Sequence, residues 1–456
     1  MNRFNLFPQP ITMNQTRRNF IKSSSLVALG MGAFPSFLSA AQMASQNDIV
    51  NMAVIGCNGM GWSNIHSHLQ MKNVRCIALC DVDDSVLARR KEDYKKYRDN
   101  AITTYKDYRK LLENKDIDAV IIGTPDHWHC KIMVDALEAG KHVYVEKPLA
   151  NSVEECYIME AAALKYNKQV VQVGQWQRSG THYAKAIDIV QSGQLGNIRL
   201  VKVWAYQGWM KPVAVQPDSA APNGVDYKMW LGPAKTRAFN PNRFHFNFRW
   251  YWDYAGGLMT DWGVHEIDIA LYAMKARAPK SVMASGGKLA YPDDASETPD
   301  TLQAVFEYEK FNMLWEHATG IDNGNYGRNE GIAFIGNNGT LVLNRGGFEV
   351  IVEDEQVDGQ RKTFMTEIAP ATTKGNYLDF HTQNFIAAIA KGDPSFAKCP
   401  PSSGSTAAIN AHMGNIAFKT GRKVYWDEAQ KNFGTDTEAN GLIGAQYNNG
   451  WQKPKI

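Results

Sequence analysis

The sequence predicts a protein of the α/β plus α+β class, with a doubly wound parallel sheet followed by an open, mainly antiparallel sheet. Two observations predict this order. Between residues 49 and 175, short apolar runs alternate with stretches of helical pattern, which is typical of a parallel sheet. After about residue 198, strand-like runs follow one another with only turns between them, which is typical of antiparallel pairing. The 456 residues are enough for two domains.

The composition excludes several classes of protein. The net charge is only +3 and no basic run is present, so we expect no nucleic-acid partner. An apolar content of 44% and 12 tryptophans predict a globular fold with room for an aromatic-lined pocket, and aromatic faces often stack on sugar rings. The six cysteines show neither a CxxC pair nor a metal-type grouping. We therefore expect buried free thiols and no metal site.

The amino terminus has the pattern of an export signal. Arg17 and Arg18 precede an apolar stretch that is too short for a membrane span, and small residues follow at 39–41. This pattern predicts a twin-arginine signal peptide over residues 1–44. The mature protein would then have no membrane span, would pass through the twin-arginine export machinery, and would be periplasmic or otherwise exported.

The first apolar run ends at Ile55 and leads into a glycine-rich turn with glycines at 56, 59 and 61. A dinucleotide-binding turn needs glycine at its first and last positions, for the tight bend and for helix packing. Asn58 stands where a third glycine is usual. The next strand ends in Asp81, and a carboxylate there would bind the adenosine ribose and favour NAD over NADP. The nearby Arg89 and Arg90 keep NADP possible.

The stretch "TPDHWHC", residues 124–130, directly follows the buried strand expected at 118–124. The two histidines and the cysteine could form a metal-binding site. Alternatively, the stretch could be a loop at the carboxyl edge of the sheet, where cofactors bind. A metal site needs several convergent ligands, and no others accompany these three. We therefore interpret the stretch as a cofactor-edge loop.

The stretch "VYVEKPLA", residues 143–150, adds a more specific signal. Together with "GCNGMG", "ALCDVD", "TPDHWH", "GGLMTDWGVHEIDIA" and "GNIAFKTGRKVYWD", in that order, it resembles the Gfo/Idh/MocA oxidoreductase family. The resemblance implies a Rossmann domain over residues 45–175 and a C-terminal domain for substrate binding and oligomerisation over 176–456. It also implies a homo-oligomer, either a dimer or a tetramer, and late helices that pack between the domains.

The resemblance assigns the candidate catalytic residues. Lys147, from the Glu-Lys-Pro motif, would lie near the nicotinamide and the substrate hydroxyl. The stretch 256–274 is expected as one helix, on which Asp261, His265 and Asp268 share a face. By resemblance, His265 is the base and Asp261 orients it, because a histidine suits the removal of a hydroxyl proton. Asp268 is expected in either a structural or a functional hydrogen bond.

The expected cofactor-binding residues lie at the ends of the parallel strands: Gly56, Asn58, Gly59, Met60, Gly61, Asp81, Thr124, Pro125, His129, Glu146, Lys147 and Gln175. The expected substrate residues are Arg178, Arg249, Trp252, Asp261 and His265. The aromatic stretch 240–257 could line a carbohydrate pocket or form a buried plug. The proline-rich insertion 209–235 is expected as a rim or a subunit contact.

Export and cofactor use together suggest a reaction. Because free NAD is scarce outside the cytoplasm, we expect the NAD to be tightly held and regenerated in each cycle. The main hypothesis is an NAD(P)-dependent oxidoreductase acting on a hydroxyl of a sugar, glycoside or polyol. The alternative is an NAD-dependent glycosidase that works by oxidation, elimination and reduction, as in some relatives of the family. A third hypothesis is a catalytically silent sugar-binding protein.

Overall fold

The computed structural model describes residues 49–456, and the predicted signal peptide lies outside them. The first sheet is parallel throughout and has the strand order β3-β2-β1-β4-β5-β6. Its strands are β1 Val50–Ile55, β2 Val74–Cys80, β3 Thr103–Tyr105, β4 Ala119–Ile122, β5 His142–Val145 and β6 Val171–Val173. The order reverses between β1 and β4, so the crevice for a dinucleotide opens at their carboxyl ends. The predicted doubly wound sheet is confirmed.

Helices cover both faces of this sheet, because alternate strand residues enter two different cores. Ala53 packs into one cluster with Val120, while Val54 packs into another with Ile121. The helices are α2 Gly59–His68, α3 Asp84–Tyr94, α4 Tyr108–Leu112, α5 His129–Glu138 and α6 Val153–Lys165. Polar caps fix the first turns of α3, α4 and α6: at the start of α3, for example, the Asp83 side chain accepts from Ser85 N.

The second sheet has nine strands in the order β16-β13-β12-β11-β7-β10-β9-β8-β17. The strands are β7 Leu200–Gln207, β8 Ser281–Gly287, β9 Thr301–Glu307, β10 Asn312–Thr319, β11 Glu330–Ile335, β12 Gly339–Asn344, β13 Gly347–Val352, β16 Ala371–Thr372 and β17 Val424–Tyr425. Its pairs are antiparallel except for β7 and β10, which run parallel. The prediction of a mainly antiparallel sheet is confirmed. The parallel pair is possible because a long connection, rather than a hairpin, joins the two strands.

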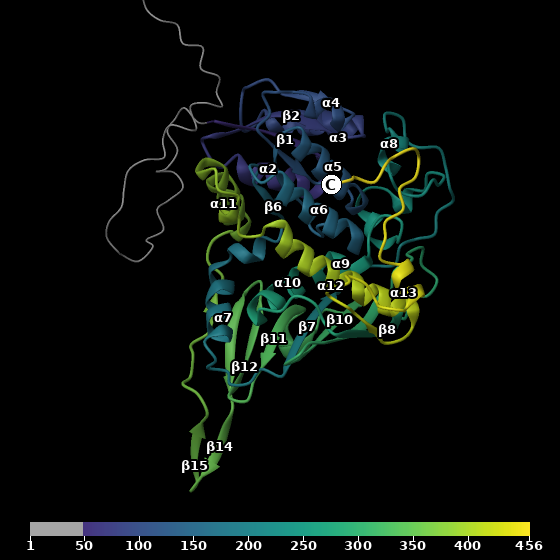
Figure 1. Cartoon of the computed structure of the whole chain (residues 1–456). Helices are drawn as coiled ribbons and strands as arrows, with labels where there is room; N and C mark the ends of the chain where they lie inside the picture. Colours follow the sequence, from purple (N-terminus) through teal and green to yellow (C-terminus); the bar gives the residue numbers. More distant parts are fainter. Residues whose placement is uncertain (1–48) are drawn as a thin grey trace, which may run out of the picture. The chain divides into compact units, whose positions relative to one another are not determined.

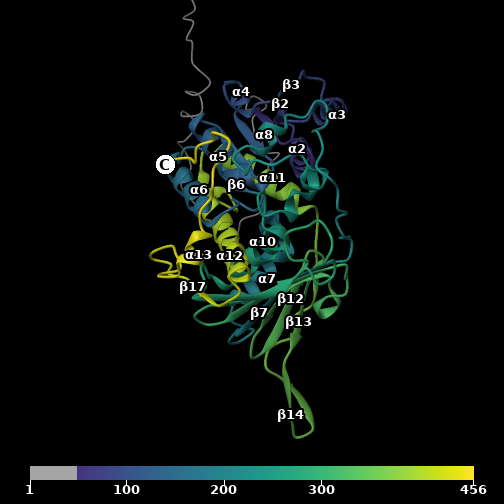
Figure 2. The same ribbon diagram turned by 90° about the vertical axis from the view of Figure 1, so that its right-hand side faces the viewer.

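Helices lie between the two sheets (Figures 1 and 2). Helix α12, Pro401–Thr420, contacts α6 of the nucleotide domain as well as α10 and β8 of the second domain. Helix α11, Tyr377–Lys391, packs on α2, and α7, Thr181–Gln191, packs on α10. The expectation that the late helices pack between the domains is therefore confirmed.

The single helix expected at 256–274 is instead two helices. Helix α9 is Gly257–Asp261 and α10 is Gly263–Met274. The break falls at Trp262, whose backbone is still close to helical, with φ −85° and ψ −38°. The interruption leaves Asp261 at the end of one helix and His265 in the first turn of the next, so the two side chains do not share one continuous helix face.

The insertion packs against the nucleotide domain. Val225 forms a β-bridge with Asp83, and Asp226 N donates to Val82 O at 2.9 Å. The short helix α8, Tyr227–Leu231, follows directly, and the C-terminal segment closes over it because Asn448 N donates to Pro233 O at 2.9 Å. The insertion therefore forms an interdomain strap, where the sequence suggested a rim or a subunit contact.

The hairpin of β14, Asp354–Val357, and β15, Gln360–Thr363, projects from the second sheet (Figure 1). All six cysteines are free and buried, as predicted. None of the helices in residues 49–456 is long and apolar enough to cross a bilayer.

Candidate active site

The glycine turn after β1 is packed so closely that side chains cannot enter it. Gly56 has φ +82°, and a Cβ atom there would lie 2.7 Å from the backbone of Gly123 and Thr124. A Cβ atom on Gly61 would lie 1.9 Å from the Gly56 carbonyl oxygen. The first turn of α2 therefore approaches the strand ends without side chains between them. Its free backbone N–H groups suit a pyrophosphate.

Asp81 follows β2 and faces this turn. Its carboxylate accepts from Cys57 N at 2.8 Å and from Asp83 N at 3.1 Å. Burial raises the pKa of Asp81. Two arginines approach the same turn from α3: Arg89 donates to the Asn58 side chain at 3.1 Å and Arg90 donates to Cys57 O at 3.2 Å. The adenosine end of the crevice thus contains both a carboxylate and cations.

Several polar atoms are buried without a partner at the carboxyl ends of the next strands. Within residues 49–456 they include Thr124 Oγ1, after β4, and Gln175 Oε1, after β6. The Gln175 Nε2 atom donates to Val264 O at 3.1 Å, so its carboxamide is held in place. Glu146, after β5, accepts from Asn64 Nδ2 at 2.7 Å. Unpaired buried groups are costly, and those at the sheet edge fit the hydroxyl and amide groups of a nicotinamide nucleotide.

The histidines of the 124–130 loop have structural partners. His127 Nε2 and Trp128 Nε1 both contact the carbonyl oxygen of Trp230 in the strap, at 3.1 and 3.0 Å. Both nitrogens of His129 lie within hydrogen-bond distance of backbone carbonyl oxygens, Nδ1 of Pro148 O and Nε2 of Thr124 O, and the neutral ring donates to one of them. Burial lowers the pKa of His127 and of His129 to about 4. In residues 49–456 no group of three potential metal ligands is present.

Lys147 lies opposite Asp261, from the other domain. Its Nζ atom donates to Asp261 Oδ1 at 2.8 Å and to the Asp261 carbonyl at 2.9 Å, and the peptide bond to Pro148 is cis. Arg249 Nε approaches the same carboxylate oxygen at 3.2 Å. Burial alone would raise the pKa of Asp261, but the charges of Lys147 and Arg249 outweigh it and lower the pKa to about 2. The carboxylate is ionised and holds the lysine in place.

His265 is buried at the start of α10, close to this ion pair. Neither of its ring nitrogens has a hydrogen-bond partner in the described part of the chain. Burial and the charge of Lys147 lower its pKa well below 6.5. The imidazole is therefore neutral and has a free nitrogen, which is what a proton acceptor needs. Asp261 is bonded to Lys147 and Arg249 and not to His265, so in this structure it orients the lysine.

Comparison with known proteins agrees with this architecture. Residues 50–175 match the family described as "Oxidoreductase family, NAD-binding Rossmann fold", and residues 179–298 match "Oxidoreductase family, C-terminal alpha/beta domain". The two matches carry one family name and together cover more than half of the chain. The chain belongs to the Gfo/Idh/MocA oxidoreductase family. The predicted family is confirmed.

Individual relatives were found by sequence and by structure. An alpha-N-acetylgalactosaminidase from Shewanella oneidensis is 29% identical over 205 residues, which are 41% of this chain and 44% of that protein. The chain thus spans under half the length of the curated relatives it matches. The structure of an aldose-aldose oxidoreductase from Caulobacter crescentus has a TM-score of 0.59 at 20% identity, over 83% of this chain and 100% of that chain. A levoglucosan dehydrogenase bound to NADH and levoglucosan has a TM-score of 0.60 at 21% identity, over 83% and 99%. These two structures show the shared fold.

Two residues expected at the substrate have other partners in this family member. Arg178 pairs with Asp268 through two contacts of 2.7 and 2.8 Å, and both side chains are buried. Trp252 donates through Nε1 to Glu297 O at 3.1 Å, and its ring lies under Lys419. The structure brings together only Lys147, Arg249, Asp261 and His265 from the predicted catalytic and substrate residues.

Sequence reasoning missed several residues around this cluster. Asp126 is buried, and although Arg249 and Lys147 oppose the effect, burial raises its pKa to about 8. Trp176 and Trp262 flank His265, with ring centroids 6.0 and 6.4 Å from that of the imidazole. Arg345 lies over both indole rings. Asp126 and Trp176 each follow a strand of the parallel sheet by three or four residues. This position just beyond a strand end was the feature of the sequence that could have identified them as site residues.

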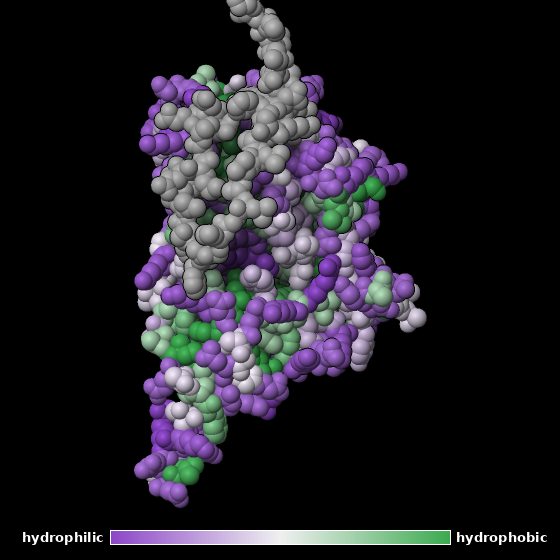
Figure 3. All heavy atoms as spheres, turned by 60° about the vertical axis from the view of Figure 1, so that its left-hand side comes forward, coloured by the Kyte–Doolittle hydropathy of each residue, from purple (hydrophilic) through white to green (hydrophobic). Residues whose placement is uncertain are grey.

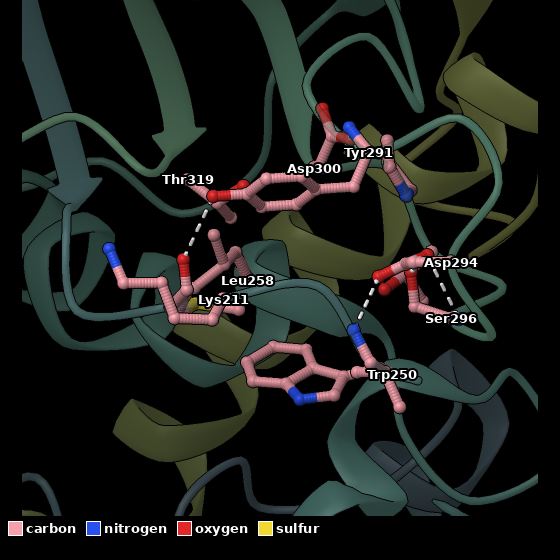
Figure 4. A pocket seen from close by; sticks show the side chains of 12 residues that line it. Lys211, Trp250, Leu258, Tyr291, Asp294, Ser296, Asp300 and Thr319 are labelled. Carbon is pink, nitrogen blue, oxygen red and sulfur yellow. Dashed lines mark hydrogen bonds between the residues drawn. The ribbon is translucent and has the colours of Figure 1, made fainter. Parts of the chain in front are cut away.

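A separate small pocket lies between the insertion and the second sheet (Figure 4). It is lined by Lys211, Trp250, Tyr291 and Asp300 among others and by none of the cluster residues Lys147, Asp261 and His265. The Asp300 carboxylate is already satisfied there, because it accepts from the backbone N–H groups of three successive residues, 289–291. These contacts indicate a structural role for this region.

Proposed function

We propose that the protein is an NAD-dependent oxidoreductase that acts on a hydroxyl group of a sugar, glycoside or polyol. One observation carries the proposal. A neutral His265 with unbonded ring nitrogens lies beside the Lys147–Asp261 ion pair, at the edge of the sheet where a nicotinamide nucleotide would bind. A silent sugar-binding protein would have no need for such an unpaired buried base.

The residues divide the work of alcohol oxidation. When bound, the nicotinamide would supply the hydride acceptor. Lys147 donates a hydrogen bond to the reacting hydroxyl oxygen, and Asp261 and the Asp261 carbonyl hold the lysine in that position. His265 takes the hydroxyl proton through a ring nitrogen that has no other partner. The rings of Trp176 and Trp262 pack beside His265 and help to hold its imidazole in place.

Asp81 supports NAD over NADP, because a buried carboxylate beside the ribose repels an additional phosphate. Arg89 and Arg90 on the other side of the turn are the groups through which NADP could bind. The strap supports tight retention of the nucleotide, since it joins the two domains along the crevice at Val82, Asp83 and Trp128.

A second candidate function is an NAD-dependent glycosidase. The relatives found by sequence favour it, because they include an alpha-N-acetylgalactosaminidase and several glycosyl hydrolase family 109 proteins. In such a reaction, oxidation at one sugar carbon acidifies the neighbouring carbon, a glycosidic substituent is eliminated, and the ring is reduced again. Lys147 and His265 would serve both reactions. The two candidate functions are therefore distinguished by their reaction products.

The test is a near-ultraviolet spectrum of the mature protein with NAD, before and after addition of sugars and glycosides, with product analysis in the same tubes. Reduced nicotinamide that persists until a second carbonyl compound is added supports the oxidoreductase. Cleavage of a glycoside without lasting reduction supports the glycosidase. The variant Lys147→Met should lose turnover and keep sugar binding, while Lys185→Met, at an exposed position of α7, serves as the matched control. Unchanged turnover in Lys147→Met contradicts the assignment.

Two further parts of the proposal concern location and assembly. The twin-arginine pattern supports export to the periplasm, and its test is fractionation of cells that express the full chain. A homo-oligomer is supported by exposed apolar side chains on strands of the second sheet, namely Leu200, Met283 and Ile351. Hydrophobic atoms also gather above the base of the projecting hairpin (Figure 3). Light scattering would count the subunits.

A further inference from the structure

Arg345 places a positive charge beside the proposed base. It lies in the turn between β12 and β13, and its guanidinium carbon is 4.3 Å from the ring centroid of Trp262 and 5.1 Å from that of Trp176. The same two indole rings flank His265. The guanidinium and the imidazole are therefore neighbours across shared tryptophans, in a half-buried position at the edge of the crevice.

No carboxylate is bound to this guanidinium. Within residues 49–456, Arg345 has no ion pair and no side-chain hydrogen bond, and its Nε atom is buried without a partner. Other arginines around the site are paired: Arg178 with Asp268 and Arg249 with Asp261. A charged group that is partly removed from water normally has a partner, because burial of an unpaired charge is costly.

The acidic residues behind Arg345 interact with it through charge but are not bonded to its guanidinium: burial raises the pKa of Glu330 and of Glu266, and the charge of Arg345 opposes this. Its backbone N–H, rather than its guanidinium, donates to Glu330 Oε1 at 3.1 Å. The Glu330 carboxyl lies against that of Glu266, which accepts from Gln177 Nε2 at 3.0 Å. Burial and the nearby Glu330 raise the pKa of Glu266, which favours a proton shared by the two carboxyl groups. The half-buried guanidinium is therefore left without a hydrogen-bonded partner within residues 49–456.

We infer that Arg345 forms an anion subsite and that the substrate is a sugar with a carboxylate group, such as a uronic acid or its glycoside. This inference rests on the proposed function, which it deepens by naming the substrate class. The planar fork of arginine binds a carboxylate through two parallel hydrogen bonds. Arg345 and His265 lie beside the same two tryptophans, which places the proposed anion subsite next to the proposed base.

The test compares methyl glycosides that differ only at the acidic group: glucuronide with glucoside, and galacturonide with galactoside. Binding is measured by calorimetry on the NAD-loaded protein, and turnover by product analysis. We expect Arg345→Gln to weaken binding of the uronides about 10- to 100-fold and to leave binding of the neutral glycosides unchanged. Arg345→Lys should retain part of the preference, because it keeps the charge and loses the fork. Arg361→Gln, on the projecting hairpin, removes one charge far from the crevice and is the control.

The outcomes separate the subsite from the reaction. Equal affinity of wild type for uronides and neutral glycosides, with no effect of Arg345→Gln, overturns the inference and leaves the proposed function intact. Arg345-dependent binding of uronides without turnover supports the subsite and contradicts the proposed function. A sulfated methyl galactoside that binds more tightly than the galacturonide overturns the carboxylate assignment. The thermal midpoint of each variant shows whether the fold is retained, and Arg345→Lys replaces Arg345→Gln if the latter unfolds.

Discussion

Replacing Asp261 by Asn should destabilise the protein, because it removes the carboxylate shared by Lys147 and Arg249. The structure sets the magnitude. The ion-paired environment lowers the pKa of Asp261 from 3.8 to about 2. The difference, 3.8 − 2, is about 1.8 pKa units, and at 1.36 kcal/mol per unit it corresponds to about 2.5 kcal/mol. Because Lys147 and Arg249 would also lose their buried counter-charge, we expect Asp261→Asn to lower the free energy of unfolding by about 2–4 kcal/mol at pH 7.

The pH dependence has a defined sign. A carboxyl group whose pKa is lowered on folding stabilises the folded state fully above its unfolded pKa, here 3.8. That contribution disappears as the pH falls toward about 2, the folded value. The free energy of unfolding of wild type should therefore exceed that of Asp261→Asn by the same amount at pH 7 and pH 5. The difference should shrink only below about pH 4.

Urea unfolding followed by tryptophan fluorescence measures this difference. The control is Asp354→Asn, which removes a carboxylate from an ion pair on the projecting hairpin where the Asp and Arg side chains are 32% and 51% exposed. We expect that surface change to cost less than about 1 kcal/mol. A cost for Asp261→Asn no larger than the control, or a difference that already declines between pH 7 and pH 5, would refute the reasoning.

Three other predictions follow from the site and its supports. His265→Gln should lower kcat/KM about 100- to 10,000-fold. Because burial and the charge of Lys147 lower the pKa of His265, the acid limb of the wild-type pH profile of kcat/KM should lie below pH 6.5. An acid limb above pH 6.5 contradicts the assignment of His265 as the base. Gly61→Ala should abolish retention of NAD through gel filtration, because its Cβ would lie 1.9 Å from a carbonyl oxygen, whereas Gly441→Ala meets nothing within 4 Å and should retain it. Arg178→Met leaves Asp268 buried and unpaired. It should lower the free energy of unfolding, measured with urea, by about 3–5 kcal/mol and leave the KM for the sugar unchanged. A raised KM at unchanged stability would place Arg178 at the substrate.

The sequence was sufficient for those parts of the fold that depend on local pattern. The strands around Asp81 and Glu146 end where the apolar runs end, and the parallel order follows from the alternation of strands and helices. Lys147 was identified because the Glu-Lys-Pro motif is contiguous. The pairing of Lys147 with Asp261 joins residues 114 positions apart, and it could not be predicted because many acidic residues satisfy the same pattern.

The remaining site residues depended on packing that no local pattern encodes. Arg345 is an unremarkable turn residue in the sequence, and it reaches the crevice only because β12 and β13 place their turn against Trp176 and Trp262. Arg178 illustrates the opposite case, because it was expected at the substrate and has another partner in the structure. Its position just beyond a strand end predicted that it lies in the crevice, but its guanidinium donates a hydrogen bond to Asp268 on α10.

The loop at 124–130 combines a feature that the local sequence pattern predicted with one that only packing determines. Its place at the edge of the sheet followed from the strand before it, and its histidines drew attention as possible ligands. In the structure, ring nitrogens of His127 and His129 contact backbone carbonyl oxygens. Asp126 is the titratable group of this loop whose pKa is affected by the charges of Lys147 and Arg249. Because burial raises the pKa of Asp126 to about 8, its carboxyl group holds a proton at pH 7 and can donate a hydrogen bond there. Asp126 is therefore the titratable group of this loop beside the ion pair, and only its burial distinguishes it from an ordinary aspartate in a turn.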